Sequence, residues 1–361
     1  MKLAAQTFWR MPGNFGVARM FGPSYSLRSV VFHDISRQVS PFTKGMNVST
    51  TPAKLEAALK FFAQHYTPVR LEDVLTNSDG RGLPDRAILV TFDDAYASVA
   101  ELAAPLCKRF GVPAVFFVNA AFLDNRRLAP DNLVCYVANT RGLEAIRAAA
   151  RLALGVDAPS PESLSDVFVR LFPQLSLAKR SAFLDALRAV AHIREEEIAE
   201  EARLYLTSKQ LSSLASIDFE IGNHTFAHVH CRSLSPEEIE SQVGRNQSEL
   251  EAIVGRKVRA FSQPYGSSED LTIELTRFLE RTGHEAVFLS ESVANERDAN
   301  PFHLDRVGSH AGSDDALFFE IEVLPRLRAV RNRLRRSSSA SRAQNAAMRR
   351  EHALHGEKNI A

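Results

Sequence analysis

The fold is decided by a short stretch of the chain, Ala87-Ile88-Leu89-Val90-Thr91-Phe92-Asp93-Asp94-Ala95-Tyr96. Its apolar, β-branched start predicts a buried strand, and the strand ends on two adjacent carboxylates. Active sites of parallel α/β proteins lie at this carboxyl end of the strands. Two neighbouring anions repel in a half-buried cleft unless a cation or a shared proton holds them there. The stretch therefore predicts a metal site whose other ligands come from elsewhere in the chain.

The best further ligands follow a second predicted strand. The run Phe219-Glu220-Ile221-Gly222 leads into His224-Thr225-Phe226-Ala227-His228, where two histidines stand four residues apart. Histidines at this spacing can present two nitrogens to one ion. The zincin pattern needs a glutamate after the first histidine, and Thr225 stands there. The base must come from another segment, and Asp93 or Asp94 supplies it.

Each half of this pattern has a simpler explanation when taken alone. An Asp-Asp pair at a strand end more often caps a helix, and a single His pair is as often a surface feature as a ligand set. The occurrence of both, each at the end of a predicted strand, favours a hydrolytic metal site.

Strand and helix patterns alternate along most of the chain. About seven extended segments, mostly separated by helices, favour a parallel barrel or an open doubly wound sheet. Helix starts are predicted at Thr51-Pro52, at Thr207 with Gln210, at Ser235 with Glu238, and at Ser267 with Asp270. The expected strands span residues 29–35, 87–92, 113–119, 219–222, 258–263, 285–289 and 302–307, and the last helix spans 314–323. The alternation is interrupted over residues 125–205, where we expect a helical insertion.

Composition limits the class of protein. The 361 residues are 45% hydrophobic, which is ample for a substantial core, and the net charge of +1 argues against a dedicated nucleic-acid binder. The three cysteines are widely separated and have no CxxC spacing, so they indicate neither a disulfide framework nor a cysteine zinc site.

The two ends of the chain differ from its body. Residues 1–28 form a basic segment without an unbroken apolar stretch, and no apolar run in the chain would span a bilayer, so we expect a cytoplasmic protein. Residues 324–361 are rich in arginine and predict a helix to about residue 336 with a disordered tail after it. Such a helix could touch the inner face of the membrane; the alternative is a solvated C-terminus.

The combined pattern resembles the polysaccharide deacetylase family, also called the NodB-homology or carbohydrate esterase 4 family. Three segments carry the resemblance: Thr91-Phe92-Asp93-Asp94, His224-Thr225-Phe226-Ala227-His228 and Phe261-Ser262-Gln263-Pro264-Tyr265-Gly266. It covers most of residues 29–310 apart from the insertion. The resemblance implies an α/β fold, a distorted (β/α)7 barrel of the NodB-homology type over residues 29–323.

The resemblance also implies roles for the residues of these motifs. Asp93 would be the catalytic base, and the metal ligands would be Asp94, His224 and His228. Pro264, Tyr265 and Arg306 would contact the substrate in the groove, with the Tyr265 N–H helping to hold the oxyanion. Zinc is the default ion for one carboxylate and two imidazoles, although other first-row divalent ions also suit them.

The chain departs from the family pattern in two places. Many members carry an arginine that orients the base where this chain has Ser262, and a late arginine such as Arg306 replaces it in some members. The Leu-x-His segment that supplies a general acid is missing, which leaves His303 and His310 as candidates. His33 either lines the groove or simply ends a strand, and His230 is expected to pack or to face solvent.

The expected activity is a metal-dependent removal of the N-acetyl group from an N-acetylated sugar, in a polysaccharide or its precursor, as in exopolysaccharide biosynthesis. One alternative is an amidohydrolase of a small amide. Another is a non-catalytic glycan-binding or assembly factor that retains the metal site.

Overall fold

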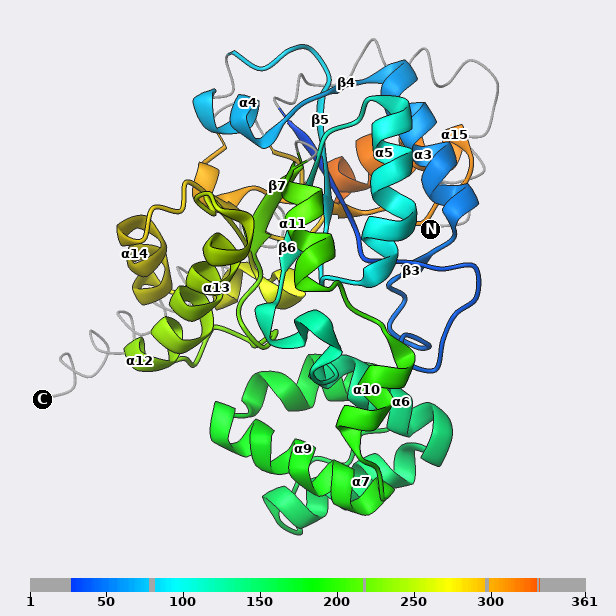
Figure 1. The fold of residues 1–361 in the computed structure, drawn as a ribbon, viewed down its shortest axis with the longest axis vertical. Helices are drawn as coiled ribbons and strands as arrows, with labels where there is room; N and C mark the ends of the chain where they lie inside the picture. The colour runs from blue at the N-terminus through cyan, green and yellow to red at the C-terminus, as the bar shows by residue number, and fades with distance from the viewer. Residues whose placement is uncertain (1–26, 78–81, 217–218, 296–298, 330, 332–361) are drawn as a thin grey trace, which may run out of the picture.

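A curled parallel sheet forms the centre of the molecule (Figure 1). The computed structural model describes residues 27–329 and residue 331, apart from 78–81, 217–218 and 296–298. Within these residues the sheet order is β10-β1-β5-β6-β7-β8-β9, with β4 pairing with β5 off this path, and every pairing is parallel. The strands are β1 (Arg28–Phe32), β4 (Thr67–Pro68), β5 (Ala87–Phe92), β6 (Ala114–Val118), β7 (Glu220–Asn223), β8 (Ala260–Ser262), β9 (Ala286–Phe288) and β10 (Val307–Gly308).

One short segment joins the two edges of this sheet. Leu304 donates its N–H to the carbonyl of Val287 and accepts from the N–H of Leu289, so it lies beside β9. Three residues later, Val307 pairs with Val30 of β1. The sheet therefore curls into a barrel-like form, which confirms the predicted α/β class and barrel architecture.

The two faces of β5 supply two separate cores. Ile88, Val90 and Phe92 pack outward under the surrounding helices, whereas Ala87 and Leu89 pack into the barrel interior. Successive side chains of a strand point to opposite faces. The interior row of β5 therefore continues through Thr91 to Asp93, the first residue after the strand.

Helices cover the outside of the barrel. They are α3 (Pro52–His65), α4 (Leu71–Thr76), α5 (Ala104–Phe110) with the preceding turn η1 (Val99–Ala103), α11 (Ser208–Ser216), α12 (Pro236–Ile239), η5 (Glu240–Gly244), α13 (Arg245–Val254), α14 (Ile273–Arg281), α15 (Asp314–Phe318) and η9 (Phe319–Val323). A small second sheet pairs β2 (Asp34–Ile35) with β3 (Ser49–Thr50). The helix starts predicted at Thr51-Pro52, at Thr207 and at Ser235 are all confirmed.

Two predicted boundaries were wrong. The helix expected to start at Ser267 begins at Ile273 with Thr272 as its cap, because the Asp270 carboxylate is bound by His230 and Arg232 instead. Residues 268–270 form a separate turn, η7. The strand expected over 302–307 is shorter, since the turn η8 (Pro301–His303) precedes it.

The interrupted region between β6 and β7 is helical. Its elements are η2 (Ala120–Asn125), α6 (Pro130–Arg141), α7 (Leu143–Leu154), α8 (Leu164–Asp166), η3 (Val167–Leu171), η4 (Phe172–Gln174), α9 (Leu177–Ala191) and α10 (Glu195–Ala202). In Figure 1 the helices α6, α7, α9 and α10 gather in a bundle at one end of the barrel. We call this group the inserted bundle, and its buried residues belong to the same apolar core as the outer face of the barrel.

The predictions for the chain ends fall largely outside the described residues. Helical conformation runs from Asp314 to Ala329, and the N-terminal segment up to residue 26 and the tail after residue 331 are not described. Among the described helices, none is both long and apolar enough to cross a membrane.

Candidate functional site

Asp93 stands at the carboxyl end of β5 in a buried ion pair with Arg306. The guanidinium donates from Nη1 to Asp93 Oδ1 and from Nη2 to Oδ2, each at 2.8 Å. Burial by itself would raise the pKa of this carboxyl, but the Arg306 charge and His224 more than offset it, so the pKa of Asp93 lies below its usual value. Asp93 is therefore held as an anion in a fixed orientation.

The remaining donors of Arg306 are also used within the protein. They bind the carbonyl of Leu289 and the hydroxyls of Thr91, Ser262 and Ser290. The side chain of Arg306 is 0% exposed. We predicted that Arg306 contacts the substrate, but a side chain buried in this way does not face a groove. In the structure Arg306 positions Asp93 instead.

Asp94 turns the opposite way because the backbone leaves the strand in a left-handed turn. Asp94 and Ala95 have φ values of 71° and 58°, a region that non-glycine residues rarely occupy. As a result, Asp94 Oδ1 lies 3.3 Å from His224 Nε2 and 3.4 Å from His228 Nε2. Burial opposes ionisation, but both histidines favour it, and the pKa of Asp94 is well below its usual range.

Hydrogen bonds at Nδ1 fix both histidine rings. His224 Nδ1 lies 2.8 Å from the carbonyl oxygen of Ser262, which can only accept, so this nitrogen carries the proton. His228 Nδ1 lies 2.7 Å from Asp131 Oδ2. In the neutral rings, the lone pair of each imidazole is then on Nε2, the atom that faces Asp94.

These three side chains fit a divalent metal ion. The ligand atoms of Asp94, His224 and His228 all lie within 4.8 Å of one another. Asp94 Oδ1 is buried and has no hydrogen-bond partner among the described residues, although a buried carboxylate oxygen is costly to leave unpaired. One carboxylate and two imidazoles with free Nε2 lone pairs form a donor set that suits a hydrolytic ion and leaves positions open.

Asp131, in the first turn of α6, belongs to the site but was not among the predicted residues. Its Oδ2 accepts from His228, and its Oδ1 accepts from the hydroxyl of Tyr265 at 3.0 Å. The carboxyl is buried, and the charge of His228 offsets the effect of burial, so the pKa of Asp131 is lowered. No sequence signal could have found Asp131, because it lies 97 positions from His228 in an insertion with no motif.

Tyr265 lies between the metal cluster and a second His-Asp pair. Its backbone adopts φ 61° in the turn η6 (Pro264–Gly266), where Pro264 is buried. The Tyr265 ring stacks on His230 with centroids 3.8 Å apart and rings 6° from parallel. His230 in turn bonds to Asp270 Oδ2 through Nδ1 at 2.8 Å. His230 is thus a packing partner of Tyr265.

His33 and the two candidate acids, His303 and His310, lie in different places. His33 follows β1, and the charges of Asp94 and Asp93 act on it, although burial lowers its pKa overall. His310 follows β10; burial and the neighbouring His33 lower its pKa, and its Nδ1 is 3.3 Å from Thr50 Oγ1. His303 is exposed in the turn before β10, and no hydrogen bond or ion pair among the described residues joins its side chain to the cluster. The structure thus favours His33 and His310 over His303.

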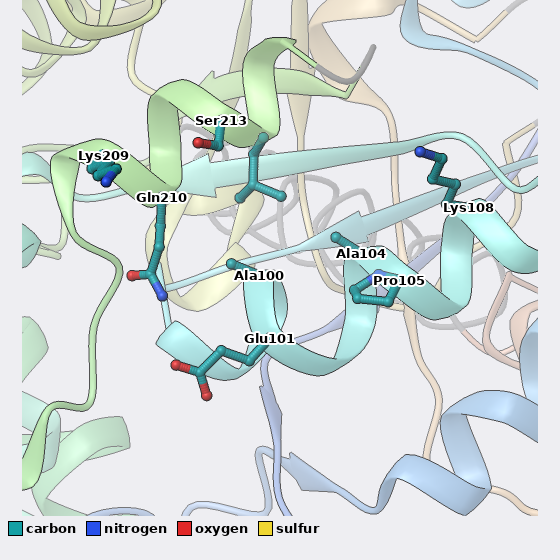
Figure 2. A pocket seen from close by; sticks show the side chains of 9 residues that line it. Ala100, Glu101, Ala104, Pro105, Lys108, Lys209, Gln210 and Ser213 are labelled. Atoms are coloured by element: carbon teal, nitrogen blue, oxygen red, sulfur yellow. The ribbon is translucent and has the colours of Figure 1, made fainter.

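A separate hollow of about 450 Å³ lies on the outer wall of the barrel (Figure 2). It is bounded by Ala100, Ala104 and Pro105 on one side and by α11 on the other, and the Gln210 side chain extends from α11 toward Ala100. None of the metal-cluster residues lines it. This hollow is therefore distinct from the candidate site.

Sequence comparison connects this geometry with a family. A family model described as polysaccharide deacetylase matches residues 180–284. The chain is 24% identical over 114 residues to the putative polysaccharide deacetylase YxkH of Bacillus subtilis (strain 168), a match that covers 32% of this chain and 40% of that protein. Over these residues the chain is similar to the polysaccharide deacetylase family.

Solved structures show the same fold. The deacetylase PplD of Streptococcus pyogenes, in complex with acetate, aligns with a TM-score of 0.54 and 13% identity, over 83% of this chain and 99% of that one. IcaB from Ammonifex degensii aligns with a TM-score of 0.51 and 16% identity, over 84% and 99%. The polysaccharide deacetylase fold thus extends over most of the chain, whereas the sequence match to the curated relative spans only two fifths of that relative's length.

Ser262 and Arg306 together account for the departure of this chain from the third motif. Ser262 Oγ accepts from Arg306 Nη2 at 2.7 Å and donates to Asp93 Oδ2 at 3.2 Å. The arginine reaches Asp93 from the residue just before β10, at a separation of 213 positions, rather than from β8. The chain therefore has an arginine that orients Asp93, supplied by a segment outside the third motif.

Proposed function

We propose that this protein is a divalent-metal-dependent deacetylase that removes the N-acetyl group from an N-acetylated sugar, in a polysaccharide or its precursor. The observation that carries the proposal is the convergence of Asp94, His224 and His228, with Asp93 beside them. Asp93 Oδ2 lies 3.8 Å from His224 Nε2, at the edge of the proposed ion site. Zinc is the proposed ion because it suits one carboxylate and two imidazoles.

The side chains divide the chemistry among them. When bound, the divalent ion would lower the pKa of a water molecule and polarise the acetamide carbonyl. Asp93 accepts the water proton, since Arg306 holds it ionised and oriented. The N–H of Tyr265 donates to the carbonyl oxygen as negative charge develops there, and Pro264 forms part of the groove.

The proton for the leaving amine comes from a histidine near the two carboxylates. We propose His33 or His310. The charges of Asp93 and Asp94 act on His33, and His310 interacts electrostatically with His33. Burial lowers the pKa of both, which makes their protonated forms stronger acids. The variants His33→Gln and His310→Gln identify the donor. Substitution of the true acid removes the fall of activity at alkaline pH, whereas substitution of the other histidine leaves it in place.

The first test compares Asp93→Asn with Asp94→Asn in the zinc-loaded full chain. With N-acetylated oligosaccharides as substrates, Asp93→Asn should lower acetate release about 10²- to 10⁴-fold while zinc content stays at the wild-type level. Asp94→Asn should lose both activity and zinc. Asp185→Asn serves as a matched control, because its exposed carboxylate pairs with Arg188 on the outside of the inserted bundle.

Three results would contradict the proposal. If the wild type and Asp93→Asn release acetate equally fast, Asp93 is not the catalytic base. If the wild type binds oligosaccharides and zinc but releases no acetate over the panel, the non-catalytic binding factor becomes the better explanation. Faster turnover of small amides than of sugars would favour the amidohydrolase.

The location in the cell and the biosynthetic role are proposals as well. We propose a cytoplasmic location and a role in exopolysaccharide biosynthesis, with peripheral membrane contact through the basic C-terminal segment. The support is the arginine-rich composition of residues 324–361.

A further inference from the structure

We propose that Asp131 of the inserted bundle is a positioning residue of the metal centre: it orients the second histidine ligand, His228, and makes the bundle a part of the site. The inference rests on the metal site of the proposed function, but not on the identity of the substrate.

The Asp131 carboxylate is fully committed to the site. Its side chain is buried, with 3% of the residue exposed. One oxygen accepts from His228 Nδ1 at 2.7 Å and the other from the Tyr265 hydroxyl at 3.0 Å. Because burying a charge is costly without partners, these two hydrogen bonds hold Asp131 in place. In return, Asp131 orients the side chains of His228 and Tyr265.

A second residue of the bundle holds the backbone of the same ligand. Arg180 of α9 is 5% exposed and donates from Nη2 to the carbonyl oxygen of His228 at 2.8 Å. Its guanidinium carbon lies 4.9 Å from the ring centre of Phe172, another bundle residue. His228 has φ 49°, a strained value that persists only when surrounding contacts maintain it.

Among the described residues, the hydrogen bonds of the other histidine come from the barrel. His224 Nδ1 donates to Ser262 at the end of β8, and the His224 carbonyl accepts from Asn119 at the end of β6. The two histidine ligands are thus anchored to different parts of the molecule. Their mutual placement depends on how the inserted bundle packs on the barrel.

This arrangement has a direct consequence for metal binding. A carboxylate that accepts from the Nδ1–H of a ligating histidine fixes the tautomer and increases the donor strength of Nε2. Loss of such a partner typically weakens metal binding about 10- to 100-fold. We therefore expect Asp131 to contribute to metal affinity although it does not touch the ion.

The test measures metal binding by the full-length protein in Asp131→Asn, Asp131→Glu and Arg180→Met. Zinc affinity is measured by competition with a coloured chelator, and Co²⁺ is used as a spectroscopic probe of the ligand field. Asp131→Asn should weaken zinc binding about tenfold or more and change the visible absorption of bound Co²⁺. Asp131→Glu keeps the charge and should recover part of the affinity. Arg180→Met should weaken binding as well.

Asp185→Asn is the matched control, since it removes an exposed carboxylate from α9 of the same bundle. It should leave zinc affinity and the Co²⁺ spectrum unchanged. Circular dichroism distinguishes a local effect from loss of fold. The proposal would be overturned if folded Asp131→Asn bound zinc within twofold of the wild-type affinity and gave the same Co²⁺ spectrum.

These readouts are independent of the proposed reaction. If the wild type releases no acetate but its zinc affinity still depends on Asp131, the deacetylase proposal fails and the inference stands. If the wild type is active and Asp131→Asn binds zinc normally, the inference fails and the deacetylase proposal stands.

Discussion

Single buried contacts decide whether the site can work. Arg306 and Asp93 form an ion pair in which neither side chain is exposed by more than 4%. Such pairs contribute little net stability compared with apolar packing, but removal of one partner leaves an uncompensated buried charge. The pair therefore serves the orientation of Asp93 more than the stability of the barrel.

Arg306→Met should destabilise the metal-free protein by about 3–5 kcal/mol, because the Asp93 carboxylate would remain buried without its cation. The double variant Asp93→Asn with Arg306→Met should recover a large part of this loss. Urea unfolding of the single and double variants measures the coupling. Additive effects of the two substitutions would show that the ion pair is not coupled as described.

His284 gives the molecule a second pH-sensitive contact, away from the cluster. It is buried with its Nε2 near the Asn223 amide, and burial lowers its pKa to about 4. The unfolded chain, with a pKa near its ordinary value of 6.5, binds a proton first as pH falls. The stabilising effect of neutral His284 is therefore present above about pH 6.5 and is lost as pH falls toward 4.

The wild type should lose about 2 kcal/mol of unfolding free energy through His284 between roughly pH 7 and pH 5. His284→Gln cannot be protonated, so its stability should fall less over the same interval. Urea unfolding at both pH values gives the difference. An identical pH dependence of the two proteins would count against a buried neutral His284.

At the scale of elements, close packing between strands brings the site residues together. Gly222 of β7 faces Phe117 of β6, and a Cβ at this glycine would lie 2.3 Å from Phe117 Cδ1. The Phe117 ring also lies near the Arg306 guanidinium, whose carbon is 5.3 Å from the ring centre. A change at Gly222 is thus transmitted through Phe117 toward the arginine that holds Asp93.

Gly222→Ala should destabilise the protein by about 1–3 kcal/mol, as overpacking of a core does. Gly308→Ala in β10 is the matched control, because the nearest atom to its added Cβ lies at 3.8 Å. Thermal unfolding compares the two variants. Equal melting temperatures would mean that Phe117 moves aside without cost.

At the scale of the whole molecule, the outer face of the barrel and the inserted bundle share one apolar core. Tyr96 after β5 stacks on Tyr205 after the bundle, with centroids 6.0 Å apart, and the Tyr205 hydroxyl donates to Asn132 of α6. The proposed metal ligands are held from both sides of this junction. Metal binding should therefore stabilise both parts together.

Zinc at about a hundred times its dissociation constant should raise the unfolding free energy by about 2.7 kcal/mol. Calorimetry should show one transition that moves to higher temperature with zinc and returns after chelation. A bundle transition that separates from the barrel and does not respond to zinc would contradict the shared core.

The sequence alone determined the parts of the protein that depend on local pattern. The apolar run before Asp93 specified a buried strand, the spacing of His224 and His228 specified a two-nitrogen ligand pair, and capping residues such as Thr51 specified helix starts. These features follow from side-chain periodicity and short-range hydrogen bonding, which the order of residues fixes directly.

Only the tertiary structure decided the contacts that join distant segments. Arg306 reaches Asp93 from the segment just before the last strand, and Asp131 reaches His228 from an insertion without a motif. Asp270 binds His230 rather than capping the next helix. The physical reason is that a buried charge takes the partner that the packed barrel brings to it, and sequence position does not encode that proximity.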